Sequence, residues 1–156
     1  MKRAKEDPHV VTIGFQGSTG EEAHADTGMT NAHLASIHEF GAVVQQGTRE
    51  ITIPERSFIR STVDKNNNYK EVIHKLGLAI ITGKLTSIPD ALKVLGEKIT
   101  SDIKRSIEQG IPPPNAPSTI KPKGSSKPLI DSGQMKNAVT YDVHPDDGRQ
   151  GITGKK

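Results

Sequence analysis

The sequence predicts an α+β fold, in which a small antiparallel sheet carries helices on one face and an extended proline-rich arm leaves the domain. Two segments rich in β-branched residues, 8–15 and 138–143, lie near opposite ends of the chain and are expected to pair. Between them, the apolar residues of segment 88–109 recur every three or four positions, which indicates an amphipathic helix. A chain of 156 residues has the size of one domain, 1–156.

The composition limits both the core and the chemistry. Aromatic residues make up only 3% of the chain and Trp is absent, so the core must be built from Ile, Leu, Val and Ala. We expect this core to be thin and to gain part of its stability from neighbouring subunits. The absence of Cys excludes disulfides and thiolate metal sites. No run of 18 apolar residues is present, and no membrane partner is therefore expected.

The first strand is followed by a loop and a short helix. Segment 16–30 is polar and rich in Gly, without periodicity, and predicts a long flexible loop. Either Thr30 or Asn31 is expected to cap a helix over 31–40, because both side chains can accept a hydrogen bond from the first turn. Gly41 then supplies the left-handed position that ends such a helix.

A hairpin and a second helical region follow. Gly47 and Thr48 separate two strand-like segments, 42–46 and 49–53, and this pattern predicts a β-hairpin. A helix is expected to begin near Ser57. Three consecutive Asn residues, 66–68, either break it or mark a kink, and helical spacing then resumes.

The long helix over 88–109 has the strongest signals in the chain. Ser87 precedes it as a cap, with Asp90 three residues on, Pro89 in the first turn and Gly110 at the end. Its apolar stripe is expected to be a main source of core stability, and it consists of Ile88, Leu92, Leu95, Ile99, Ile103 and Ile107.

The segments after this helix predict irregular structure. Residues 111–127 contain five prolines and are expected to form an extended arm. The last residues, 145–156, are rich in Gly, Asp and Lys and predict a frayed C-terminal tail.

Positive charge is concentrated in one part of the chain. The net charge is +3, and segment 84–127 carries eight Lys and Arg against four Asp and Glu. A basic segment can bind phosphate, so one alternative is a nucleic-acid-binding accessory protein that uses residues 84–127. The other interpretation is a solvated helix face followed by a Lys-rich loop.

No motif in the sequence predicts catalysis or a bound metal. His33 and His38 are five residues apart and do not share one helix face. Residues 14–20 resemble a phosphate-binding loop in their glycines but lack its Lys-Ser/Thr pair. Cys is absent, and no Ser lies in a nucleophile-elbow motif. We therefore expect no cofactor and no enzymatic activity.

Three segments together resemble the virion-morphogenesis or tail-completion (neck) protein family of tailed bacteriophages, to which the G-like proteins of phage Mu belong. Residues 34–41 (LASIHEFG) are similar to L-A-x-I-H-E-F-G, and residues 53–60 (IPERSFIR) are similar to I-P-x-R-P-F-[LM]-R. Residues 128–135 (PLIDSGQM) are similar to P-L-[IV]-[DR]-T-G-x-L, and 115–120 match the proline-led segment before it. The motif residues with a candidate interface role are His38, Glu39, Phe40, Gly41, Pro54, Arg56, Phe58, Arg60, Leu129, Asp131 and Gly133.

The resemblance implies a structural role at the head–tail junction or at the tail end. It implies a homo-oligomeric ring, a hexamer or dodecamer, that docks to neighbouring neck or tail-tube and terminator proteins. DNA would only pass through the lumen of the ring. The protein would be assembled in the host cytoplasm and become part of the virion.

Five of the motif residues carry more specific expectations. Phe40 and Phe58 are expected to anchor the first helix and the hairpin on the core. Glu39, Arg56 and Arg60 are expected to form ion pairs, and Arg is suited to such oriented contacts. Two interpretations remain open for these pairs: they set the start of a helix within the chain, or they bridge subunits.

Overall fold

The computed structural model describes residues 8–24, 27–66, 68–115, 129 and 133–148. Part of the predicted arm (116–127), Asp131 and part of the predicted tail (149–156) lie outside the described residues. The elements in chain order are β1 (His9–Gly14), α1 (Gly17–Glu21), α2 (Asn31–Phe40), β2 (Ala42–Gln46), β3 (Arg49–Ile53), α3 (Arg60–Lys65), α4 (Tyr69–Ile81), α5 (Ile88–Gln109), α7 (Gln134–Ala138) and β4 (Thr140–Pro145).

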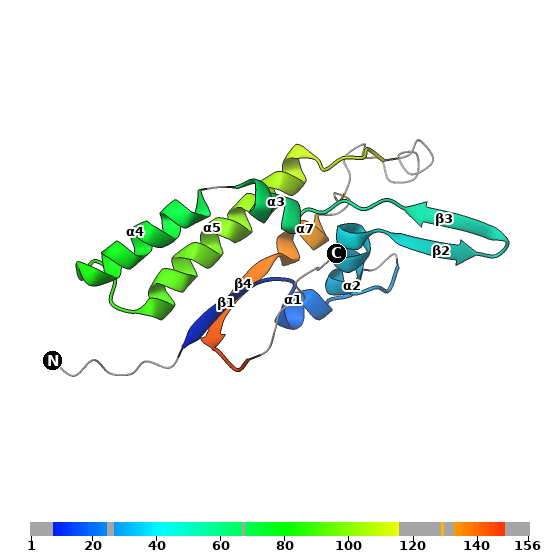
Figure 1. Cartoon of the computed structure of the whole chain (residues 1–156). Coiled ribbons are helices and arrows are strands. Elements are labelled where there is room, and N and C mark those ends of the chain that lie inside the picture. Colours follow the sequence, from blue (N-terminus) through cyan, green and yellow to red (C-terminus); the bar gives the residue numbers. More distant parts are fainter. Residues whose placement is uncertain (1–7, 25–26, 67, 116–128, 130–132, 149–156) are drawn as a thin grey trace.

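The predicted α+β class is confirmed (Figure 1). Among the described residues the strands form two separate two-stranded antiparallel sheets, β1–β4 and β2–β3, instead of one. Pairing of the first and last strands is confirmed, with Val11 opposite Val143 and Ile13 opposite Tyr141. Helix α5 packs along the β1–β4 sheet, and α4 packs on α5.

The last strand is displaced from the predicted segment. Ala138 ends α7, so β4 begins at Thr140 and continues to Pro145. The N–H of Asp146 donates to the Pro8 carbonyl at 2.7 Å. The prediction of a frayed tail from residue 145 is therefore wrong at its start, because backbone pairing with β1 orders this part.

Helix α5 has the predicted bounds and the predicted cap. The Ser87 hydroxyl accepts a hydrogen bond from the N–H of Asp90. Four residues of the predicted stripe are buried in the core, Leu95, Ile99, Ile103 and Ile107. Each contributes about 1.5–3 kcal/mol to the free energy of unfolding. Ile88 is exposed at the start of the helix, so the stripe is buried in the core only from Leu95 onward.

The expectation of a long flexible loop over 16–30 is wrong for part of this segment, of which residues 25–26 lie outside the described residues. Residues 17–21 form helix α1, and Ala23 bridges to Thr30. The fully buried Asn31 donates to the Thr19 carbonyl at 2.8 Å, and its Oδ1 lies 2.8 Å from His24 Nε2. In residues 17–24, polar side-chain bonds to Asn31 take the place of the apolar periodicity that the sequence lacks.

The helices α2, α3 and α4 keep their predicted order with one shifted boundary. Thr30, and not Asn31, caps α2, since its hydroxyl accepts from the N–H of His33 at 3.2 Å. Helix α3 begins at Arg60 instead of near Ser57. The break before α4 is confirmed, and α4 starts at Tyr69.

A close contact joins α5 to the sheet at Gly96. A Cβ atom on Gly96 would lie 2.5 Å from Cδ2 and 2.6 Å from Cγ of Tyr141. Such distances are shorter than van der Waals contact, so only Gly lets the Tyr141 side chain approach the helix this closely.

We expect Gly96→Ala to lower the free energy of unfolding by about 1–3 kcal/mol, because the ring of Tyr141 must move away. The matched control is Gly77→Ala in α4, where a Cβ would meet nothing within 4 Å. That change should raise stability by up to about 1 kcal/mol through helix propensity. Urea denaturation measures both, and equal effects of the two substitutions would contradict the proposed contact.

Candidate functional site

Two of the three motif segments meet at the carboxylate of Glu39. Glu39 lies at the end of α2 and is only 5% exposed. Its Oε2 accepts hydrogen bonds from the N–H groups of Phe58 (2.8 Å) and Ile59 (3.0 Å). Its Oε1 accepts from the Ser57 hydroxyl (2.8 Å) and from the N–H of Arg60 (3.0 Å). We call this arrangement the Glu39 clamp.

The Glu39 clamp explains where α3 begins. The N-cap residue of α3 is Ile59, whose side chain cannot accept a hydrogen bond. The first N–H groups of a helix need acceptors, and a negative charge there also interacts favourably with the helix dipole. Glu39, which belongs to α2, supplies both the hydrogen-bond acceptors and the negative charge. Of the two interpretations stated for this group, the structure contains the one that sets a helix start within the chain.

Arg60 closes the clamp from the solvent side. Its Nε lies 3.2 Å from Glu39 Oε1, and its Nη2 lies 2.6 Å from Glu55 Oε1. The guanidinium carbon lies 5.1 Å from the centre of the Phe40 ring, a distance typical of a cation–π contact. The predicted ion pair between Glu39 and Arg60 is confirmed.

The two aromatic residues of the motifs differ in role. Phe58 is fully buried, and its ring packs edge-on against Phe15 with centroids 6.1 Å apart, so its prediction as a core anchor is confirmed. Phe40 is 46% exposed, so the same prediction for Phe40 is wrong. Its position at the end of α2 turns the ring toward Arg60 and solvent, because Glu39 takes the inward direction.

Arg56 binds backbone carbonyls, and its predicted ion pair is not found among the described residues, which do not include Asp131. Its Nε donates to the Pro113 carbonyl at 2.8 Å and its Nη2 donates to the Pro114 carbonyl at 3.2 Å. Burial lowers the pKa of Arg56 below its ordinary value. Ile111 is buried as well, so the beginning of the predicted arm packs on its own chain.

Gly41 and Pro54 form the root of the hairpin. Gly41 has φ 73°, and a Cβ there would lie 3.0 Å from both the Ile53 carbonyl oxygen and the Glu55 nitrogen. The N–H of Arg56 also donates to the His38 carbonyl at 2.7 Å. The two strands of the hairpin are therefore held close together, and by a hydrogen bond to α2, at the point where they leave the domain.

The third motif segment is only partly described. Leu129 is buried in the core with φ 64°, and Gly133 has φ 80° just before α7. Helix α7 packs against α2, the helix that carries Glu39. The described part of this segment thus packs against the helix of the first motif, and it is not part of the Glu39 clamp.

The β2–β3 hairpin extends away from the helices and from the β1–β4 sheet (Figure 1). Val44 lies opposite Ile51 in the register, and both side chains are 43% exposed. Val43, on the other face, is 62% exposed. A two-stranded hairpin that buries neither face is marginally stable in water. Burial of these apolar side chains against a partner surface would therefore stabilise the hairpin.

A cavity of about 590 Å³ lies between α2 and the β1–β4 sheet. We call it the α2 cavity. Its apolar walls come from several elements, and it also reaches Glu39, Arg60 and the strand residue Asp142. The apolar lining residues include Ile13, Phe15, Ala35, Phe40 and Ile59.

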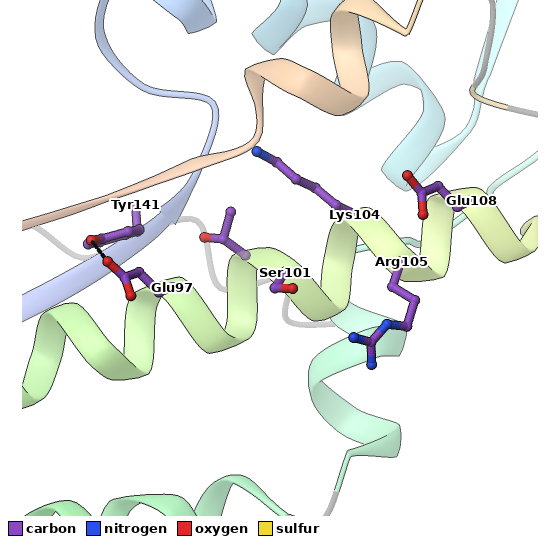
Figure 2. A pocket seen from close by; sticks show the side chains of 7 residues that line it. Glu97, Ser101, Lys104, Arg105, Glu108 and Tyr141 are labelled. Carbon is purple, nitrogen blue, oxygen red and sulfur yellow. Dashed lines mark hydrogen bonds between the residues drawn. The ribbon is translucent and has the colours of Figure 1, made fainter.

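The part of the basic segment that belongs to α5 forms a polar surface. A shallow pocket of about 430 Å³ is lined by both acidic and basic side chains (Figure 2). Lys104 and Arg105 point to different sides of the helix, and the Tyr141 hydroxyl donates to Glu97 at 3.1 Å. Several cations are already paired with carboxylates: Lys93 with Asp90, Lys98 and Arg105 with Asp102, and Lys136 with Glu108.

Asp102 is a second buried carboxylate, which the sequence reasoning missed. It accepts hydrogen bonds from the Tyr69 hydroxyl and from Asn66 Nδ2, each at 3.0 Å, and from Lys98. The spacing of Lys98 and Asp102 was the only signal in the sequence. Burial raises the pKa of Tyr69 to about 12, and the hydrogen bond to Asp102 acts in the same direction.

Among the described ranges, no group of three His, Asp or Glu side chains is placed to hold a metal ion. Within the same part of the chain, no helix is long and apolar enough to cross a membrane. No family model matches the chain, and the searches of curated proteins and of solved structures return no significant match.

We expect Glu39→Ala to lower the free energy of unfolding by about 3 kcal/mol, because the start of α3 loses its acceptor inside the protein. Glu39→Gln, which keeps one acceptor oxygen, should cost less. The control is Glu55→Ala, which removes an exposed partner of the same Arg60 and should change stability by less than about 0.5 kcal/mol. Similar losses for Glu39→Ala and Glu55→Ala in urea denaturation would contradict the capping role.

A second prediction concerns pH. The folded state favours the protonated Tyr69, so its stabilisation is present below the ordinary pKa of 10.0 and is lost as the pH rises toward about 12. Tyr69→Phe should cost about 1 kcal/mol at neutral pH, and the difference from the wild type should shrink above pH 10. Urea denaturation over a pH series measures this, and a difference independent of pH would refute it.

Proposed function

We propose that this chain is a structural virion-assembly protein of a tailed bacteriophage, acting at the head–tail junction or the tail end, and that it is not an enzyme. The observation that carries the proposal is the projecting hairpin. The two motif segments that resemble the tail-completion family flank it, and the Glu39 clamp fixes its root. An apolar element that the chain holds away from its own core is suited to docking.

The polar side chains of the motifs bind groups of their own chain, and this supports a structural role. Both oxygens of Glu39 accept hydrogen bonds from the chain itself, and Arg56 binds two backbone carbonyls. These groups set the geometry of the hairpin root. Shape complementarity between rigid surfaces, and not a reaction, is the mechanism that we infer.

A second exposed apolar surface lies on α4. Ile73, Leu78 and Ile81 are all exposed, Ile81 by 82%. Exposed apolar clusters on a soluble protein mark contact surfaces. We propose that neighbouring neck, tail-tube or terminator proteins and further copies of this chain share these surfaces in a ring, with DNA in its lumen.

The alternative, a nucleic-acid-binding accessory protein, depends on residues 84–127. Binding to DNA needs cations that are free to contact phosphate. In the described part of this segment, Lys93, Lys98 and Arg105 lie within 4.0 Å of Asp90 or Asp102. This pairing favours the assembly role.

Deletion of the gene in the phage or prophage that carries it tests the proposal. We expect filled heads and separate tails to accumulate without joining, or tails with defective ends, in electron micrographs. Expression of the wild-type chain from a plasmid should restore infectious particles. Normal particles in the deletion strain would refute the proposal.

The alternative makes a different prediction for the purified protein. The assembly role predicts weak binding to duplex DNA at physiological salt. Tight binding, near nanomolar and lost when Lys104 and Arg105 are both changed to Glu, would instead support the accessory protein. Both side chains lie off the apolar stripe of α5, so the double variant should remain folded.

A further inference from the structure

The two faces of the β2–β3 hairpin differ in chemistry. Residues directly opposite in an antiparallel pair share a face, and side chains alternate along each strand. One face therefore carries the pairs Ala42–Ile53 and Val44–Ile51, and we call it the apolar face of the hairpin. The other face carries Val43 opposite Thr52 and Gln45 opposite Glu50, and the Gln45 amide donates to Glu50 at 3.1 Å.

The apolar face ends in a positive charge at its tip. Arg49 is two residues from Ile51 on the same strand, so it lies on the apolar face, and it is exposed. The α2 cavity has the complementary arrangement. Its walls include Phe15, Phe40 and Ile59, and Asp142 is exposed at its edge.

The hairpin cannot reach the α2 cavity of its own chain. Its root is fixed by the close approach of Gly41 to Ile53 and by the bond between Arg56 and the His38 carbonyl. From this root the hairpin points away from the β1–β4 sheet, which forms one wall of the cavity (Figure 1). Two complementary surfaces on one rigid chain that point in different directions can meet only between copies.

We infer that the apolar face of the hairpin inserts into the α2 cavity of a second copy of this chain, with Arg49 of one copy against Asp142 of the other. This is a head-to-tail contact, which repeats from copy to copy and closes into a ring when the rotation permits. The volume of the cavity, about 590 Å³, is in the range of pockets that enclose several side-chain groups. The inference rests on the proposed function in so far as that function requires copies to associate.

Disulfide crosslinking tests the contact, because the chain has no Cys of its own. Ser36→Cys places a thiol in the exposed lining of the α2 cavity, and Val44→Cys places one on the apolar face. The two variants are mixed and oxidised. The matched control is Val43→Cys, one residue away on the opposite face.

We expect the mixed dimer of Ser36→Cys with Val44→Cys to form roughly tenfold faster than that with Val43→Cys, because only one face enters the cavity. Equal rates for the two hairpin positions would overturn the inference. A dominant Val44→Cys homodimer would also overturn it, since it would show two hairpins packing on each other.

Charge exchange tests the polar part of the contact. Arg49→Asp and Asp142→Arg should each weaken self-association by about tenfold or more in sedimentation experiments, through like-charge repulsion. The double variant should recover most of the wild-type association. Both residues are exposed, so circular dichroism should show an unchanged fold.

These outcomes separate the inference from the proposed function. If the wild-type protein forms oligomers that neither charge variant weakens, the copies meet through another surface, such as α4. The hairpin contact is then wrong, while the proposed function stands on the gene deletion. If the deletion leaves particles normal but crosslinking succeeds, the contact stands and the phage role is wrong.

Discussion

The buried carboxylate of Glu39 is the interaction on which the middle of the structure depends. This one side chain at the end of α2 accepts hydrogen bonds from the N–H groups that start α3 and forms an ion pair with Arg60. It thereby fixes the root of the hairpin, which lies between α2 and α3 in the chain. An ionised group is costly to bury unless several donors compensate it, and here five donors do so. Because these donors lie on one short segment, the position of the hairpin follows from that of α2.

The parts of the fold that local pattern determines could be predicted from the sequence. The bounds of α5 follow from Ser87, Gly110 and an apolar period of three to four residues. The hairpin follows from Gly47 between two β-prone segments, and the pairing of β1 with β4 follows from their similar composition. Each of these signals lies within the element that it specifies, or in a simple match between two elements.

What the sequence could not show depends on partners distant in the chain. The sequence predicts an ion pair for Arg56, whereas in the structure its guanidinium donates to the carbonyls of two prolines that lie 57 and 58 residues further along the chain. Phe40 is exposed because its neighbour Glu39 takes the inward position. Residues 17–24 are held by the polar bonds of Asn31 to Thr19 and His24, and such bonds leave no hydrophobic period to detect in the sequence. The sequence predicts an ion pair for Glu39 but not its capping role, which depends on where α3 begins in space.

The pairing of β1 with β4 has a consequence for the order of folding. During synthesis β1 emerges early and has no partner until β4 has been made, since these strands lie at opposite ends of the described chain. Loop closure over such a distance is entropically costly and slow compared with helix formation. The helices can therefore form first, and the part of α5 that β4 covers stays exposed until the last strand is made. In that interval the nascent chain exposes apolar surface and is prone to aggregate. Chaperones or rapid completion of translation would limit this aggregation.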